Sequence, residues 1–332
     1  MKPLPTGNYK IPLLLLIVLS LIPVFIKSPY ILSIAITVLL YAFSGNAWNI
    51  AGGYCGQLSL GHAAYFGLGA YTSTMLFLKF GVSPWGGMIV GAVIVGVVAA
   101  ILGYPSLRLK GPYFIFFTIA FAEAIRIFFL AWDWVEGARG IIIPFQDSLV
   151  NFMSLSKVFY YYVALGFLII GMLVTYLIAN SKMGKYFIAI REDEMAAEAL
   201  GINTALYKTY AFAISAALVA IGGAFYAQYN LYIDPDCTMV LSNSVLYMLV
   251  AVVGGRGTLF GPLIGSVIIM PLWERSRAMF GGQFAGLSLI IAGLIIVVVG
   301  LAAPNGLMGI LSRIRTRYLK SKVSIIEEEK RV

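Results

Sequence analysis

The chain has 332 residues, of which 61% are hydrophobic and only 11% charged, with a formal net charge of +9. Soluble domains carry about 25% charged residues, so the composition excludes a soluble globular protein and indicates a polytopic membrane protein. The basic residues fall between apolar stretches, which argues against nucleic acid binding. The sequence has no phosphate-binding Gly-x-x-x-x-Gly-Lys-Ser/Thr motif and no His/Cys cluster. It therefore predicts no catalytic residue, no metal site and no cofactor within this chain.

Hydropathy predicts an all-α fold with about ten transmembrane helices, some of them short or broken. Each apolar stretch is near the about 20 residues that a helix needs to cross a bilayer. The first has the basic ends and apolar core of a secretory signal but no cleavage site, so we expect it to remain as a membrane helix. We expect a transmembrane domain over 1–310 and a cytoplasmic tail over 311–332. The predicted spans are 11–26, 30–50, 63–79, 86–103, 112–131, 159–179, 209–229, 241–254, 258–273 and 286–302.

The stretch 49–62 is rich in glycine and polar residues within an otherwise apolar region. A bilayer tolerates non-helical backbone only where protein or a water-filled cavity satisfies it. The pattern indicates either a broken helix beside a polar path or tight helix packing through small residues. A polar path would use the donors and acceptors of Asn46, Asn49, Gln57 and Ser59. Interhelical hydrogen bonding, worth about 0.6 kcal/mol on average, is the alternative for each of them.

Two further polar features lie in the first half of the chain. His62 is the single histidine, and at a packed turn we interpret it as a hydrogen-bonded structural residue rather than a titrating one. Glu123 and Arg126 are three residues apart in one span and are predicted to pair. Charges inside a span indicate function by default, and a structural pair that contacts a neighbouring membrane subunit is the alternative that we favour.

The internal segment 180–208 carries more charge than any other. Acidic residues open its second part and glycine closes it, an order that predicts a short helix over 191–201. Met195, Ala196, Ala199 and Leu200 share one face of this helix. Such an apolar face fits a groove on a cytoplasmic partner, and an ordinary solvated loop helix is the alternative.

The charge distribution predicts that both termini are cytoplasmic, because most of the 23 Lys and Arg then lie on the inner side. Cys55 and Cys237 fall on opposite sides of the membrane in this topology. Basic residues over 313–322 favour this orientation of the last span and also attract anionic lipid.

Glycines interrupt the chain twice in a similar way, at 52–56 and at 254–262. Paired interruptions in two halves indicate a transport pathway at a pseudo-symmetric interface. The short spans 241–254 and 258–273 are either two tilted crossings or one re-entrant pair, and the same question applies to 51–62.

Several runs together resemble the permease subunits of branched-chain amino acid ABC transporters, specifically the LivM type. The first runs are Ala-Gly-Gly over 51–53, Gly-Gln-Leu-Ser-Leu-Gly-His-Ala-Ala-Tyr-Phe over 56–66 and Gly-Leu-Gly-Ala-Tyr over 67–71. The later ones are Ala-Ile-Arg-Glu-Asp-Glu over 189–194 with 196–201, then Lys208, 211–212, 215–216, Gly-Gly-Arg-Gly-Thr over 254–258 and Gly-Pro over 261–262.

The resemblance implies three kinds of partner: a related second permease, two cytoplasmic ATP-binding subunits and an extracytoplasmic substrate-binding protein. Membrane lipid is a further partner, expected from the apolar spans and the basic tail. ATP and Mg²⁺ would be bound by the ATP-binding subunits. It also implies a coupling helix with the signature Glu-Ala-Ala-x-x-x-Gly, which Ala196, Ala197 and Gly201 match, whereas Met195 stands at the glutamate position. The residues expected to couple to the ATP-binding subunits are Arg191, Glu192, Asp193, Glu194, Ala196, Ala197, Glu198 and Gly201.

The expected function is therefore ATP-driven import of branched-chain, hydrophobic amino acids across the plasma membrane by alternating access. A urea or short-chain amide permease of the same family is the first alternative. A stand-alone ion-coupled carrier is a second, although Glu123 is essentially the only carboxylate inside a predicted span.

Overall fold

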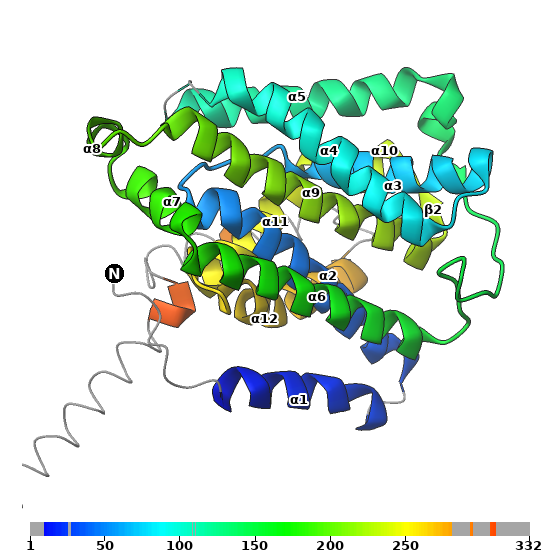
Figure 1. The fold of residues 1–332 in the computed structure, drawn as a ribbon. Helices are drawn as coiled ribbons and strands as arrows, with labels where there is room; N and C mark the ends of the chain where they lie inside the picture. The colour runs from blue at the N-terminus through cyan, green and yellow to red at the C-terminus, as the bar shows by residue number, and fades with distance from the viewer. Residues whose placement is uncertain are drawn as a thin grey trace, which may run out of the picture.

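The structure, a computed structural model, describes residues 10–25, 28–107, 109, 111–280, 293–294 and 306–309. Within these ranges it is a helical bundle with one β-ribbon, made of two strands of two residues each (Figure 1). The long helices are α1 (Lys10–Phe25), α2 (Pro29–Asn49), α3 (His62–Phe80), α4 (Pro84–Ser106), α5 (Pro112–Ala131), α6 (Lys157–Asn180), α9 (Thr204–Asn230), α11 (Leu241–Gly255) and α12 (Gly261–Phe280). The short helices are α7 (Lys182–Glu192), α8 (Glu194–Ala199) and α10 (Pro235–Thr238), and η1 (Ile50–Tyr54) continues α2 as a π-helix.

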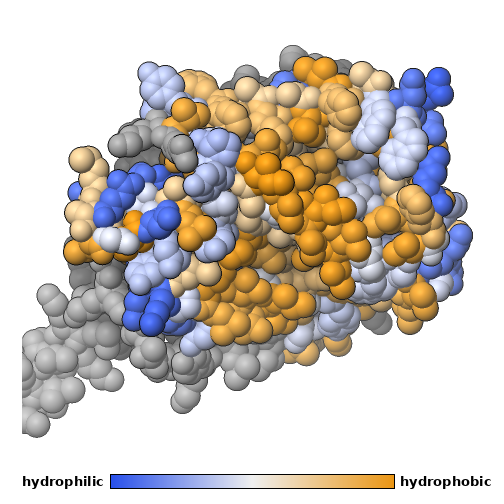
Figure 2. All heavy atoms as spheres, turned by 45° about the horizontal axis from the view of Figure 1, so that its top comes forward, coloured by the Kyte–Doolittle hydropathy of each residue, from blue (hydrophilic) through white to orange (hydrophobic). Residues whose placement is uncertain are grey.

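The first nine predicted spans each coincide with one of these long helices. The tenth, 286–302, and the boundary of the tail at 310 lie outside the described residues, apart from 293–294. Six stretches of the described chain are long and apolar enough to cross a membrane: Pro29–Tyr54, Pro84–Ser106, Pro112–Ala131, Lys157–Asn180, Thr204–Asn230 and Pro235–Gly255. The chain is thus an all-α, multi-pass membrane protein, as predicted. Figure 2 shows an apolar band across the middle of the bundle, with hydrophilic residues gathered toward its two ends.

Local sequence explains where several helices begin and end. Proline occupies the first turn of α2, α4 and α5, where its missing N–H costs nothing. Gly81 ends α3 in the left-handed conformation, with φ of 66°.

The bundle has two ends. Ile141–Ile142 (β1) pairs antiparallel with Tyr232–Ile233 (β2), so the long loop after α5 reaches the segment that follows α9. We call this the ribbon end. The opposite end, which holds η1, α7, α8 and the turn 256–260, we call the glycine end. Figure 1 shows α7 and α8 at one extreme and β2 at the other.

The sequence left open whether the two glycine-rich stretches are re-entrant. The stretch 254–262 is a turn that joins α11 to α12: Thr258 in this turn meets Asn49 at the glycine end, and Trp273 of α12 lines a cavity at the ribbon end. In the first stretch the backbone from Cys55 to Gly61 is irregular and returns into the bundle before α3 begins. Thr118 Oγ1 accepts from the Leu60 N–H at 3.1 Å, and the Trp48 indole donates to the Ser59 carbonyl at 2.8 Å. Protein therefore satisfies the non-helical backbone, as a membrane interior requires.

Glycines also bring α3 and α9 together. A Cβ on Gly69 would lie 2.2 Å from the Ala220 carbonyl oxygen, and one on Gly223 would lie 1.8 Å from that of Phe66. Any larger side chain would push the two helices apart. Tight packing through small residues is therefore real in this bundle, alongside the broken helix at 55–61.

Candidate functional site

The two glycine-rich stretches meet at the glycine end. Asn49 Oδ1 accepts from the Gly257 N–H at 2.8 Å, and Asn49 Nδ2 donates to the Thr258 carbonyl at 2.9 Å. A Cβ on Gly53 would lie 1.8 Å from Asn49 Oδ1 and 2.7 Å from the Gly257 nitrogen. Only glycine at position 53 allows this approach. We call the contact of 49–57 with 254–258 the glycine junction.

Arg191, the next-to-last residue of α7, inserts into the glycine junction. Its Nη1 donates to the Gly53 carbonyl at 3.1 Å. Gly56 and Gly257 both have positive φ, 77° and 71°, and a Cβ on either would lie within 2.8 Å of the arginine side chain. These two glycines therefore leave a slot that the arginine fills.

Glu192 completes the arrangement around the arginine. Its carboxylate accepts from Nε and Nη2 of Arg191 at 3.2 and 2.6 Å. These hydrogen bonds, with the charge of the arginine, lower the pKa of the Glu192 carboxyl. The guanidinium is thus held on one side by the backbone carbonyl of Gly53 and on the other by the carboxylate of Glu192.

The residues 191–201 form two helices and not the single helix that was predicted there. Arg191 and Glu192 belong to α7, and a new helix, α8, starts at Glu194. Asp193 separates them because its backbone is extended and its Oδ1 caps α8 by accepting from the Ala196 N–H at 3.0 Å. Gly201 follows α8 with φ of 81°, which is the expected glycine stop.

The four residues predicted to form an apolar face are all exposed, although Leu200 lies just beyond the end of α8. Met195 is 72% exposed and Leu200 81% exposed, and the alanines 196 and 199 are exposed with them. Ala197 is buried on the opposite side. Figure 1 shows α8 at the extreme of the glycine end.

Two polar contacts connect α8 to α9. The Lys208 ammonium, on a residue that is only 2% exposed, lies 2.5 Å from Glu194 Oε1. Thr204 Oγ1 donates to Glu198 Oε1 at 2.6 Å. Glu194 and Glu198 thus fix α8 to the start of α9.

A hollow of about 610 Å³ lies beside these residues. Gln57, Pro112, Ile190, Arg191 and Met195 are among its lining residues. Gln57 Nε2 lies 3.5 Å from the Cys55 carbonyl. Of the four residues predicted for the substrate path, Gln57 lines this hollow and Asn46, Asn49 and Ser59 do not.

The other three path residues are buried and hydrogen-bonded. Asn46 Oδ1 accepts from Thr175 Oγ1 at 2.6 Å, Asn49 joins the glycine junction, and Ser59 Oγ accepts from the Gly61 N–H at 3.2 Å. The contacts of Asn46 and Asn49 match the interhelical alternative, whereas that of Ser59 is local to the irregular loop. A direct role in substrate passage stays a prediction for all four residues.

His62 makes a structural contact. Its Nε2 lies 2.8 Å from Ser215 Oγ, and that hydroxyl donates its own hydrogen to the Ala47 carbonyl at 2.7 Å. The imidazole is therefore the donor to Ser215. It connects α3 to α9 and α2.

The ribbon end holds a second cavity, of about 600 Å³, which no sequence motif signalled. Six aromatic residues line it: Tyr41, Phe66, Tyr226, Tyr229, Tyr247 and Trp273. Asp236 and Glu274 add two carboxylates. The lining comes from α2, α3, α9, α11 and α12 and from the segment around α10, so no local pattern in the sequence contains it.

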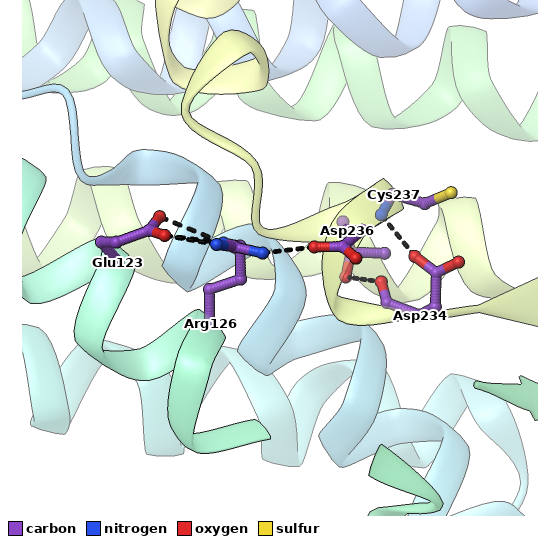
Figure 3. A network of polar contacts seen from close by, with 6 residues as sticks. Glu123, Arg126, Asp234, Asp236 and Cys237 are labelled. Atoms are coloured by element: carbon purple, nitrogen blue, oxygen red, sulfur yellow. Dashed lines mark hydrogen bonds and ion pairs between the residues drawn. The ribbon is translucent and has the colours of Figure 1, made fainter. Parts of the chain in front are cut away.

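The predicted Glu123–Arg126 pair is present on α5 and has a third member. Arg126 Nε donates to Glu123 Oε2 at 3.0 Å, and Arg126 Nη1 contacts Asp236 Oδ1. Figure 3 shows the guanidinium between the two carboxylates, with Asp234 beside them capping the Cys237 N–H. The triad connects α5 to the segment that borders the aromatic cavity. Cys237 lies here at the ribbon end and Cys55 at the glycine end, as predicted.

Comparisons with known proteins agree with this picture. A family model described as the permease component of branched-chain amino acid transport systems matches residues 30–300. The high-affinity branched-chain amino acid transport permease LivM of Escherichia coli K12 is 26% identical over 327 residues, covering 91% of this chain and 76% of the relative.

Two other relatives belong to different systems or subunits. LivH of Escherichia coli K12, also a branched-chain amino acid transport permease, is 25% identical and covers 81% of this chain and 91% of its own. The nucleoside ABC transporter permease NupC of Lactococcus lactis is 24% identical, and the match covers 76% of this chain and 81% of NupC. No solved structure matches the chain significantly.

Proposed function

This chain belongs to the permease family of branched-chain amino acid transport systems, as a LivM-type member, and we propose that it carries branched-chain amino acids inward as the membrane subunit of an ATP-driven importer. Its proposed partners are a LivH-like second permease, two cytoplasmic ATP-binding subunits that hold ATP and Mg²⁺, and an extracytoplasmic binding protein.

The proposed orientation has the glycine end in the cytoplasm of a cell bounded by its plasma membrane. Basic residues at that end support it: Lys182, Lys185, Arg191, Lys208 and Arg256. Positive charge is favoured in cytoplasmic loops. The ribbon end with its aromatic cavity then faces outward, toward the binding protein.

The proposed mechanism is alternating access driven through α8. The exposed face with Met195 and Leu200 docks in a groove of an ATP-binding subunit, and closure of those subunits displaces α8. Arg191 passes this displacement to the glycine junction, where α2 meets the turn between α11 and α12. Lys208 passes it to α9. The helices that border both cavities are then moved together.

Such a permease needs only a weak substrate site of its own. A ligand shifts a two-state equilibrium only by its differential affinity for the two states. The nucleotide-driven subunits supply that difference here, and the binding protein supplies most of the selectivity.

One observation carries the proposal: α8 presents an apolar face outward while Arg191, at the end of the preceding helix, is inserted into the glycine junction. The test replaces Met195 and Leu200 by Asp in the assembled transporter. We expect the ATP-binding subunits to dissociate and leucine uptake to fall at least about tenfold, because the docked apolar area is lost. Leu155→Asp is the matched control, since Leu155 is 81% exposed at the ribbon end. Intact assembly of the double variant would refute the docking role.

A further inference from the structure

The aromatic cavity at the ribbon end has the size of a small-molecule site. Its volume of about 600 Å³ lies within the about 300–1,000 Å³ typical of ligand pockets. Its rings form a continuous wall, because Tyr247 lies 5.4 Å from Tyr41 and 5.7 Å from Phe66, measured between ring centroids. An aliphatic group would bury apolar surface against this wall.

The polar groups of the cavity favour a cation over an anion. None of the described side chains that line it is Lys or Arg, and two are carboxylates. The side-chain amide of Asn243 donates a hydrogen bond to the Cys237 carbonyl at 2.8 Å. The lining thus offers two carboxylates and aromatic ring faces, which attract a positive charge, beside hydroxyl groups that can donate or accept. The Lys157 ammonium donates to one of these hydroxyls, Ser33 Oγ, at 2.5 Å.

The two carboxylates are not equivalent. Asp236 is paired with Arg126, so its charge is compensated from outside the cavity. Glu274, on the last part of α12, has no ion-pair partner among the described residues and is partly buried. Among the described residues, Glu274 is therefore the cavity carboxylate whose negative charge is free to meet a cation.

We infer that this cavity binds the substrate by its α-ammonium group, which Glu274 holds, with the aliphatic side chain against the Tyr41–Tyr247–Phe66 wall. The inference rests on the proposed function and deepens it. It requires a ligand with a cationic end and an apolar body. A neutral amide or urea has no cationic end, so the cavity selects amino acids over the substrates of amide permeases.

The first experiment measures binding to the full chain in lipid nanodiscs by tryptophan fluorescence, because Trp273 lines the cavity. The probes are L-leucine and (S)-2-hydroxy-4-methylpentanoate, which carries a hydroxyl where leucine carries the ammonium. We expect leucine to bind at least about tenfold more tightly, since a hydrogen bond to a charged group is worth about that factor or more. Trp273→Phe should abolish the signal.

Glu274→Gln should reduce the preference for leucine to within about twofold, and Glu274→Asp should keep part of it. The matched control is Asp147→Asn, an exposed carboxylate at the same end but outside the cavity. Equal binding of the two probes to the unmodified chain would overturn the inference, as would an undiminished preference in Glu274→Gln. A fluorescence change caused by Na⁺ alone would also overturn it, in favour of a coupling ion.

The second experiment uses the transporter reconstituted with its partner subunits. The binding protein sets the half-saturating concentration, so the uptake rate is measured at saturating leucine-loaded binding protein. We expect Glu274→Gln to lower this rate at least about fivefold and Asp147→Asn to leave it unchanged. If the unmodified assembly takes up no leucine, the proposed function fails. If it takes up leucine and Glu274→Gln equals it, only the ammonium site fails.

Discussion

Nη1 of Arg191 donates a hydrogen bond to the carbonyl oxygen of Gly53 at 3.1 Å, across 138 residues of sequence. The bond joins the end of α7 to the π-helical end of α2. Gly257 borders the same guanidinium, so one side chain contacts both glycine-rich stretches. Under the proposed mechanism, this is where movement of the coupling segment enters the bundle.

Arg191→Gln should lower leucine uptake by the assembled transporter about tenfold or more. The substitution removes a hydrogen bond from a charged donor, worth about 1.5–3 kcal/mol, and leaves the slot between Gly56 and Gly257 underfilled. The measurement is radiolabelled leucine uptake at matched expression. Lys185→Gln is the control because Lys185 is exposed on the same helix. Equal uptake by the two variants would contradict the role of Arg191.

Asn49→Leu should destabilise the chain by about 1–3 kcal/mol for each backbone group that it leaves unpaired. These groups are the Gly257 N–H and the Thr258 carbonyl. Thermal unfolding in detergent measures the effect, with Asn180→Leu, an exposed asparagine at the end of α6, as control. If Asn49 instead served the substrate path alone, transport would fall while the melting temperature stayed the same.

Glu194 and Lys208 should show a strong energetic coupling. Glu194→Gln leaves the Lys208 ammonium buried without its partner, which costs about 3–5 kcal/mol for a fully buried pair. We expect the lower part of that range, because the Glu194 side chain is 31% exposed. A double-mutant cycle with Lys208→Met measures the coupling by equilibrium unfolding. The double variant should be more stable than Glu194→Gln alone, and strictly additive effects would exclude the coupling.

Gly201→Pro should leave the protein inserted and folded but uncouple ATPase stimulation from uptake. Proline fixes φ near −65°, whereas Gly201 has φ of 81°, and it removes the N–H that Gly201 donates to the Glu198 carbonyl at 2.9 Å. The end of α8 must therefore move. Gly201→Ala is the graded control, because an alanine Cβ meets no atom there and adds only about 1–2 kcal/mol of backbone strain. Unchanged uptake in Gly201→Pro would count against the coupling role.

Local patterns in the sequence were sufficient for the fold class and for much of the coupling segment. Nine predicted spans coincide with described helices, because a span depends on a run of apolar residues in one stretch of chain. The exposed face with Met195 and Leu200 was predictable from three- and four-residue spacing. The end of the helix near Gly201 was also predictable, because a glycine after a helical stretch is a signal carried by neighbouring residues.

Those patterns misplaced the start of the coupling helix by three residues. Acidic residues favour the first turn of a helix, and Glu192, Asp193 and Glu194 all fit that position. The cap of Asp193 on the Ala196 N–H decides between them. Only the backbone conformation at Asp193 distinguishes one long helix from two short ones.

The sequence by itself determined that this chain is an all-α membrane protein with a charged, glycine-ended segment over 191–201, because apolar runs and helix caps are properties of neighbouring residues. The permease family was indicated by the runs of residues that resemble it. Only the tertiary structure decided that Asn49 joins the two glycine-rich stretches, that Arg191 lies between them and that Asp236 joins the Glu123–Arg126 pair. It also decided that six aromatic residues from five helices line one cavity. Such contacts depend on how far each helix is rotated and how deeply it sits in the bundle, and no short stretch of sequence specifies either.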